Sequence, residues 1–325
     1  MSPTPGAPVR WGFLGAGFVA TQALGLAVHA AQGAELAVVG ARDLERARAL
    51  GPARAVRSYA EVCASPEVDA VYVALPNDDH LPWVLAALAA GKHVLCEKPL
   101  GRTAAEVATM TTAAQESGLL LVEAAWNQWH PRTRRFRALA AGLAEPRVVR
   151  AWFTFPGVAQ GNYRLDPVRG GGALLDVGCY TVAAALAGLA GEATEATEAV
   201  VVGSVARHVG PTEVDLSTTA VLSHPRGTAT VTASFEAPES QGVTVEAPGC
   251  SIEFLGPAFT TWRAACALRI VTDGVERVEH FEACDAYQMM VQAVSARIRG
   301  EQGWVWPLSH ALAVAGVLDA ISDHP

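Results

Sequence analysis

Between residues 9 and 122 the chain alternates short apolar runs with alanine-rich stretches of helical length, and this alternation constrains the fold more than any other feature. Runs that are apolar throughout are typical of parallel strands whose sheet is covered by helices on both faces. Right-handed connections between such strands give a doubly wound sheet. The sequence therefore predicts an α/β domain with strands at 10–14, 36–40, 55–56, 70–74, 93–96 and 119–123, and helices at 17–32, 44–50, 59–64, 81–90 and 104–117.

The pattern changes after Glu123, where most strand-like runs follow one another without helices between them. Such a run of strands indicates a mostly antiparallel sheet. Its strands are expected at 147–155, 199–206, 216–223, 227–235, 242–247, 250–255 and 267–271, with helices at 170–189, 286–299 and 309–321. Because 325 residues exceed one hydrophobic core, we expect a first domain over 1–123 and a second over 124–325, whose closing helices can pack back on the first.

Composition narrows the class of protein. The chain is 51% hydrophobic and 17% charged, as in a compact globular protein, and its net charge of −8 gives no basic surface for nucleic acid or an anionic membrane. Its six cysteines lie far apart without CxxC spacing, so we expect reduced thiols and no metal site. The proline-rich start has no apolar signal segment, and no window approaches a membrane span. These features predict a soluble, cytoplasmic protein.

A glycine turn follows the first strand and opens the first helix, in the pattern GxGxxA. Gly15 permits the tight turn, and Gly17 lets a pyrophosphate approach the backbone. The helix start at Phe18 and Val19 then supplies oriented N–H groups for an anion. In this strand–turn–helix context the motif predicts a dinucleotide site.

The end of the second strand distinguishes NAD from NADP. An acidic residue there binds the ribose 2′-OH of NAD, whereas an arginine accommodates the 2′-phosphate of NADP. Ala41 stands at the acidic position, Arg42 follows it, and Asp43 fits as the N-cap of the next helix. NADP(H) is therefore favoured over NAD(H). In the alternative interpretation Arg42 is a solvated loop charge and Asp43 reaches the ribose.

The fourth strand ends in a polar segment, and ligands bind beyond the carboxyl ends of such strands. Leu75, Pro76, Asn77 and His80 are therefore candidates to line the ribose–nicotinamide half of the site. Alternatively, His80 lies near a helix N-cap and faces water.

Three segments together resemble one family. They are the GxGxxA turn, "YVALPNDDHLPWVLAALAAGKHVLCEKPLG" at 72–101, and "GGGALLDVGCY" at 170–180. In order and spacing they are similar to the Gfo/Idh/MocA oxidoreductases. This resemblance implies an N-terminal Rossmann domain, a C-terminal α/β domain with an open, mostly antiparallel sheet, and nicotinamide-dependent chemistry on sugars or polyols.

The resemblance makes Lys98, in the Glu97-Lys98-Pro99 step, a catalytic residue where nicotinamide and substrate meet. An ammonium at the carboxyl edge of a parallel strand can stabilise the alkoxide that develops during hydride transfer. Glu97 is then its orienting neighbour, and Pro99 fixes the backbone. The alternative is a structural Lys–Glu pair at the end of a strand.

Asp176 and Tyr180 are four residues apart and share a helix face. The resemblance is to the subgroup with tyrosine at this second position, which includes glucose–fructose oxidoreductase, dihydrodiol and xylose dehydrogenases, and sugar ketoreductases. It implies that Tyr180 is the general acid/base, with its pKa lowered by Lys98. Asp176 is expected to accept a substrate hydroxyl or to orient the helix. The alternative for Tyr180 is an ordinary core tyrosine.

Three further residues are candidates for substrate binding. Arg164 resembles an arginine of the tyrosine subgroup that precedes the glycine run, and its alternative is a salt bridge with Asp166 or Asp176. Trp126 could stack on a sugar ring and His130 could bind a hydroxyl, although aromatic residues at a domain junction also serve packing.

We therefore hypothesise an NADP(H)-dependent oxidoreductase that interconverts a secondary alcohol and a ketone on a sugar, keto sugar or cyclic polyol, as a homodimer or tetramer built through the second sheet. Two alternatives stay within this chemistry: a nucleotide-sugar 3-ketoreductase of a deoxysugar pathway, and a trans-dihydrodiol or xylose-type dehydrogenase. An alternative of another class is a non-catalytic NADP- or sugar-sensing regulator of the same fold.

Overall fold

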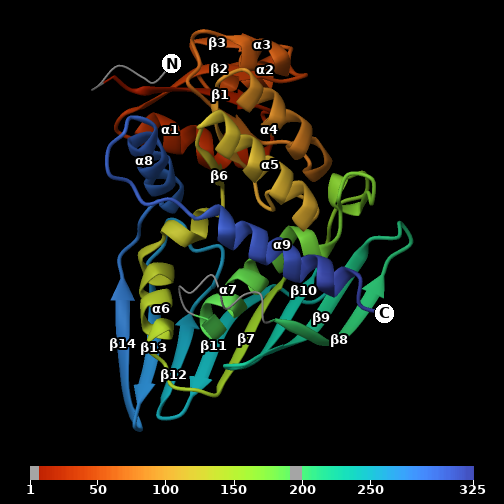
Figure 1. The fold of residues 1–325 in the computed structure, drawn as a ribbon, viewed down its shortest axis with the longest axis vertical. Helices are drawn as coiled ribbons and strands as arrows, with labels where there is room; N and C mark the ends of the chain where they lie inside the picture. Colours follow the sequence, from red (N-terminus) through yellow and green to blue (C-terminus); the bar gives the residue numbers. More distant parts are fainter. Residues whose placement is uncertain (1–6, 191–199) are drawn as a thin grey trace. The chain divides into compact units, whose positions relative to one another are not determined.

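The computed structural model describes residues 7–190 and 200–325. The chain divides into two compact units (Figure 1). The first consists of Met1–Gly101, Ala105–Trp129 and Asp285–Ala311, and the second of Arg102–Ala104, His130–Cys284 and Leu312–Pro325. None of the described helices has both the length and the apolarity that crossing a membrane requires. All six cysteines are free thiols.

The first unit is built on a six-stranded sheet in the order β3-β2-β1-β4-β5-β6. Every pair of neighbours is parallel, which confirms the predicted doubly wound sheet. Its strands are β1 (Val9–Leu14), β2 (Ala34–Gly40), β3 (Arg54–Val56), β4 (Ala70–Val73), β5 (His93–Cys96) and β6 (Leu121–Glu123). Its helices are η1 (Ala20–Leu24), α1 (Gly25–Ala30), α2 (Leu44–Ala49), α3 (Tyr59–Ala64), η2 (Asn77–Asp79), α4 (His80–Ala89), α5 (Ala104–Ser117), η3 (Trp126–Trp129) and α8 (Ala286–Ile298). β4 is buried at every position, as expected of a strand covered on both faces.

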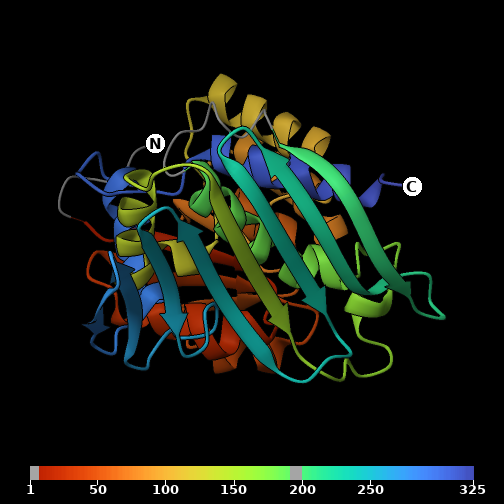
Figure 2. The same cartoon turned by 90° about the horizontal axis from the view of Figure 1, so that it is seen from below.

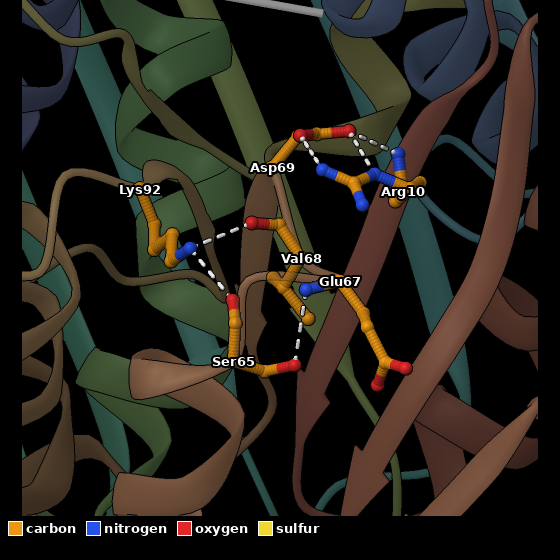
Figure 3. A network of polar contacts seen from close by, with 6 residues as sticks. All are labelled: Arg10, Ser65, Glu67, Val68, Asp69 and Lys92. Atoms are coloured by element: carbon orange, nitrogen blue, oxygen red, sulfur yellow. Dashed lines mark hydrogen bonds and ion pairs between the residues drawn. The ribbon is translucent and has the colours of Figure 1, made fainter. Parts of the chain in front are cut away.

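A polar latch joins the amino ends of three neighbouring strands (Figure 3). Arg10 of β1 forms an ion pair with Asp69, which directly precedes β4, at 2.7 Å. Lys92, which directly precedes β5, donates to the carbonyl oxygens of Ser65 and Val68 at 2.8 and 2.7 Å. These contacts fix the end of the sheet opposite to the one that carries the glycine turn.

The second unit contains an eight-stranded sheet in the order β14-β13-β12-β11-β7-β10-β9-β8 (Figure 2). Only the β7–β10 pair is parallel, so the predicted open, mostly antiparallel sheet is confirmed. Its strands are β7 (Arg147–Thr154), β8 (Val201–Val209), β9 (Asp215–His224), β10 (Gly227–Ser234), β11 (Ser240–Ala247), β12 (Cys250–Leu255), β13 (Cys266–Thr272) and β14 (Val275–Phe281). Residue 199 of the strand expected at 199–206 lies outside the described residues.

One face of this sheet carries the hydrophobic core. Along β7, Val149, Ala151 and Phe153 are buried, while the intervening side chains face the other way. The helices of this unit are α6 (Pro131–Ala141), η4 (Tyr163–Leu165), η5 (Leu174–Gly178) and α7 (Cys179–Ala190). α7 packs on β7, β10 and β11, and α9 (Leu308–Ser322) ends in this unit.

Two of the predicted helices begin irregularly. The helix expected at 17–32 contains the π-helical segment η1 and then α1, and the helix expected at 170–189 contains η5 and then α7. Single π-helical turns often occur at functional sites. The second of them contains Asp176 and directly precedes the turn that carries Tyr180.

Candidate functional site

The glycine turn has the shape that a dinucleotide requires. Gly15 has φ +100°, and a Cβ there would lie 2.5 Å from the carbonyl oxygen of Ala74, so no side chain fits. A Cβ at Gly17 would meet nothing within 4 Å, which leaves open space over the backbone for a pyrophosphate. Phe18 is 78% exposed and Val19 is half-buried. These residues fit NAD(P), whose binding they would support with the first backbone N–H groups of the helix.

Asp43, three residues after the end of β2, is the helix N-cap that the sequence predicts. Its carboxylate caps α2, where Oδ1 accepts hydrogen bonds from the N–H groups of Glu45 and Arg46 at 2.9 and 3.3 Å. Ala41 is buried and Arg42 is exposed. Asp43, the carboxylate nearest in sequence to the end of β2, is therefore engaged as a helix cap, and Arg42 is an exposed charged side chain there.

His80 connects two of the predicted cofactor segments. Its ring is fully buried, so the alternative interpretation, in which His80 faces water, is wrong. Nδ1 lies 3.0 Å from the carbonyl oxygen of Pro99, and Nε2 lies 3.0 Å from that of Leu75. Burial lowers the pKa of His80, although the carbonyl oxygens of Leu75 and Pro99 oppose the shift, and a neutral ring donates to only one of these two oxygens at a time. His80 thus holds the segment after β4 against the segment after β5. Beside it, Asn77 is buried and Pro76 half-buried.

Two buried carboxylates, Glu97 and Glu123, accept hydrogen bonds from the backbone of the Lys98 segment. Glu97 accepts a hydrogen bond from the hydroxyl of Tyr72 at 2.6 Å and one from the backbone N–H of Lys98 at 3.2 Å. The backbone N–H of Leu100 donates to Glu123 at 2.9 Å. Together with the contact between His80 and Pro99, these bonds hold the backbone on both sides of Lys98.

Glu123 is a member of this site that the sequence did not identify. It ends β6 beside Cys96, and burial raises its pKa to about 7, although the bond from Leu100 and the charge of Lys98 oppose the shift. Burial and Glu97 together raise the pKa of Tyr72 well above its ordinary value. One sequence feature could have identified Glu123: it is a glutamate at the end of an apolar strand. That strand, β6, lies beside β5, the strand that leads to Lys98.

In the second unit, Asp176 and Tyr180 lie on consecutive helical turns and are 6% and 9% exposed. The Tyr180 ring contacts those of Phe153 and Phe259, with centroids 5.8 and 5.7 Å apart. Asp176 accepts a hydrogen bond from Nε of Arg164 at 2.7 Å. Of the two acidic partners foreseen for Arg164, the structure thus shows Asp176.

The glycine run makes this ion pair possible. The N–H of Gly172 donates to the carbonyl oxygen of Arg164 at 2.9 Å, and a Cβ at Gly171 would lie 2.6 Å from the same oxygen. Burial alone would lower the pKa of Arg164, but Asp176, Tyr163 and Tyr180 raise it. The guanidinium therefore stays charged and lies within electrostatic reach of the Tyr180 hydroxyl.

Trp126 and His130 have clear structural roles. Trp126, in the first unit, stacks on Tyr287 with ring centroids 4.8 Å apart. His130, in the second, caps α6 by accepting a hydrogen bond from the N–H of Arg132 at 3.1 Å. Its Nε2 lies 3.9 Å from Sγ of Cys266, and burial followed by Arg132 lowers its pKa to about 4. Substrate binding by either residue stays a prediction.

The predicted residues thus form two sets. The glycine turn, His80 and the Lys98 segment belong to the first unit, and Arg164, Asp176 and Tyr180 belong to the second. Over residues 7–190 and 200–325, no three histidine, cysteine, aspartate or glutamate side chains are grouped as metal ligands.

Comparisons with known proteins agree with this geometry. Residues 9–124 match the oxidoreductase family with an NAD-binding Rossmann fold, Gfo/Idh/MocA, and residues 133–256 match the Gfo/Idh/MocA C-terminal domain. The chain is 34% identical over 97% of both sequences to D-xylose 1-dehydrogenase (NADP(+)) 2 of Haloferax volcanii. It is 38% identical, over 54% of both sequences, to trans-1,2-dihydrobenzene-1,2-diol dehydrogenase of Macaca fuscata fuscata.

Among solved structures, KijD10, a 3-ketoreductase from Actinomadura kijaniata in complex with NADP and TDP-benzene, is similar over 98% of both chains, with a TM-score of 0.87 and 27% identity. The family models cover both the Rossmann sheet and most of the second sheet. The chain therefore belongs to the Gfo/Idh/MocA family of NAD(P)-dependent oxidoreductases.

Proposed function

We propose that this protein is an NADP(H)-dependent oxidoreductase that interconverts a secondary alcohol and a ketone on a sugar, keto sugar or cyclic polyol. In this proposal residues 1–123 bind the cofactor, residues 124–325 bind the substrate, and Lys98 and Tyr180 act on the same substrate oxygen. NADP(H) in its site supplies or accepts the hydride.

The observation that carries the proposal is the way the Lys98 segment is held. Three buried polar groups, Glu97, His80 and Glu123, bond the backbone at Lys98, Pro99 and Leu100. Burying two carboxylates near each other costs free energy, which is consistent with a site that must position one residue closely.

Lys98 is the electrostatic partner in this proposal. In the reductive direction its ammonium stabilises the negative charge that develops on the substrate oxygen. The same charge favours ionisation of Tyr180 and brings its pKa nearer to neutral. Tyr180 gives its hydroxyl proton to that oxygen in reduction and, as a phenolate, removes the proton in oxidation.

The cofactor preference is supported by two observations at the end of β2. Asp43 is engaged through Oδ1 as a helix cap, which supports the interpretation that it is not the ribose 2′-OH partner, and Arg42 is exposed. The names of two similar proteins, the xylose dehydrogenase and KijD10, also mention NADP.

Xylose-type and dihydrodiol-type substrates are the preferred candidates within this class, because the chain is similar in sequence to the xylose and dihydrodiol dehydrogenases named above. A nucleotide-linked sugar would need a cation for its phosphates. Arg164, an arginine predicted to bind substrate, is instead paired with Asp176, and this favours a substrate without a diphosphate.

The test is turnover of NADPH with a panel of keto sugars, and of NADP+ with aldoses and cyclic diols, followed at 340 nm. Lys98→Met and Tyr180→Phe should each lower kcat by at least about 100-fold, the usual contribution of a general acid. Tyr59→Phe, which removes a phenol hydroxyl from α3, serves as the matched control and should keep full turnover. A protein that binds NADPH but turns over none of these substrates would instead be a sensor of the same fold.

A further inference from the structure

A second arginine lies at the place where Arg42 emerges. β2 and β3 are parallel neighbours, Gly40 pairs with Val56, and the N–H of Ala41 donates to the carbonyl oxygen of Val56 at 3.0 Å. The chain therefore leaves both strands at the same edge of the sheet. Arg57 is the first residue after β3, and its Nη1 donates to the carbonyl oxygen of Arg42 at 2.9 Å.

Both arginines are exposed, and in residues 7–190 and 200–325 neither has a carboxylate partner. Arginines close by in the sequence are neutralised, since Arg48 pairs with Glu45 and Arg54 with Glu67. Two guanidinium groups without a counter-charge that arise from adjacent strand ends repel each other unless an anion lies between them.

From this arrangement we infer that Arg57 is a specificity-determining residue, which together with Arg42 binds the 2′-phosphate of NADP(H). The inference rests on the proposed preference for NADP. A guanidinium has five N–H donors. The bond to the carbonyl of Arg42 uses one of them, so Arg57 positions the turn and still offers donors and a full charge to a phosphate dianion.

The chemistry explains why a second cation is useful here. Both side chains are exposed, so water and salt screen each of them, and one flexible arginine holds a phosphate weakly. Two arginines that start from backbone positions linked by a hydrogen bond can contact the phosphate from two directions. NAD(H) has a hydroxyl at this position and would gain little from either charge.

The experiment measures direct binding of NADPH and NADH by fluorescence titration, with 2′,5′-ADP and 5′-AMP as adenosine-side probes in calorimetry, on the full chain. Arg57→Ala should weaken NADPH and 2′,5′-ADP by about tenfold or more, and NADH and 5′-AMP by less than twofold. Arg57→Gln, which keeps N–H donors for the Arg42 carbonyl but not the charge, should behave like Arg57→Ala. The salt dependence of NADPH binding should become shallower in both variants.

Arg297→Ala is the matched control, because it removes an exposed positive charge of the same unit from helix α8; its ratio of NADPH to NADH affinity should stay that of the wild type. If the wild type prefers NADPH and Arg57→Ala keeps that preference, the inference is overturned while the proposed cofactor stands. Equal losses for NADPH and NADH, or an Arg297→Ala effect as large as that of Arg57→Ala, also overturn it. A wild type that binds both cofactors equally overturns the NADP preference and, with it, the role of Arg57.

Discussion

Arg164, which is half-buried, and Asp176, which is buried, form an ion pair, and such pairs add little net stability because the charges lose part of their hydration. Their position suggests another reason for their presence. Asp176 lies one helical turn from Tyr180, so an isolated carboxylate there would oppose ionisation of the phenol. Arg164 neutralises that carboxylate at 2.7 Å. The pair therefore keeps the surroundings of the proposed acid/base favourable to its ionised form.

We predict that Arg164→Met moves the pH profile of the oxidative reaction. Without the guanidinium, the Asp176 carboxylate raises the pKa of Tyr180, and the rise of kcat/KM with pH should shift upward by about one unit. The charge-balanced double variant Arg164→Met/Asp176→Asn should return most of the way to the wild-type profile. Profiles of kcat/KM against pH measure the shift. As a second measurement, the tyrosinate absorbance at 295 nm is recorded for each protein and for the same protein with Tyr180→Phe, and the difference between the two reports the ionisation of Tyr180.

The groups that face Tyr180 in this unit include Asp176 one helical turn before it, Arg164 of η4, and the rings of Phe153 and Phe259. Arg135→Met removes an arginine that pairs with Glu279 instead, and its profile should match the wild type. A lower kcat in Arg164→Met with an unmoved profile would mean that the ion pair only supports the fold.

Glu123 gives a second prediction at this scale. Its pKa is about 7 in the folded protein and about 4.5 in the unfolded chain, so the folded state binds the proton more tightly. The resulting stabilisation is complete below pH 4.5 and is lost as the pH rises through 7. Glu123→Gln does not titrate and keeps an oxygen for the Leu100 N–H, so relative to wild type its free energy of unfolding should rise by about 1–3 kcal/mol between pH 4.5 and 8.

Urea unfolding of both proteins across this pH range measures the difference. A constant gap between Glu123→Gln and the wild type at every pH would show that the carboxyl has no raised pKa in the folded state.

At the scale of elements, the latch at the amino ends of β1, β4 and β5 has a different task from the site at their carboxyl ends. Lys92→Met should lower the free energy of unfolding by about 1–3 kcal/mol, because the carbonyl oxygens of Ser65 and Val68 both lose their donor. Arg48→Ala, which removes an exposed pair within α2, should cost less than about 0.5 kcal/mol. Urea midpoints compare the two, and equal midpoints would contradict the structural role of Lys92.

The sequence predicted those elements whose residues have a clear burial pattern. β4 and β5 were predicted as parallel strands because β4 is apolar throughout and β5 is apolar after His93. β14 was not predicted, and its sequence VERVEHF explains why: it is an edge strand with nearly every side chain exposed, so it has no apolar face to detect. The π-helical segments were also missed, since the change from α to π geometry leaves no periodic signal over five residues.

At the site, sequence analysis identified the residues that belong to local motifs, such as Gly15 and Asp43. Sequence analysis did not show which contacts hold the site segments in place. The bonds from His80 to Pro99 and from Leu100 to Glu123 join residues 19 and 23 positions apart, and only the order of the parallel strands brings them together. Likewise, the choice between Asp166 and Asp176 as partner of Arg164 depends on how the glycine run folds.

At the scale of the whole molecule, the free face of the second sheet bears on assembly. On β7, β10 and β9 the side chains opposite the core include Val148, Thr230 and Val221, and the two valines are 38% and 37% exposed. Thr230 pairs with Val221 across the sheet. Strands that carry valine and threonine toward solvent over three neighbours form a surface suited to association, which is the basis for proposing a homodimer or tetramer through this sheet.

This proposal predicts that the wild-type chain sediments as a dimer or tetramer at micromolar concentration. Val221→Glu should shift it toward the monomer, because the new carboxylate on this face of β9 would be buried in the interface without a partner. Val275→Glu is the control, since Val275 is 72% exposed on the edge strand β14, which is separated from β7, β10 and β9 by three other strands; it should leave the sedimentation profile unchanged. Sedimentation velocity, with circular dichroism to confirm that each variant is folded, gives both results. A wild type that is monomeric throughout would exclude the oligomer, and a Val275→Glu variant that dissociates while Val221→Glu does not would exclude assembly through β7, β10 and β9.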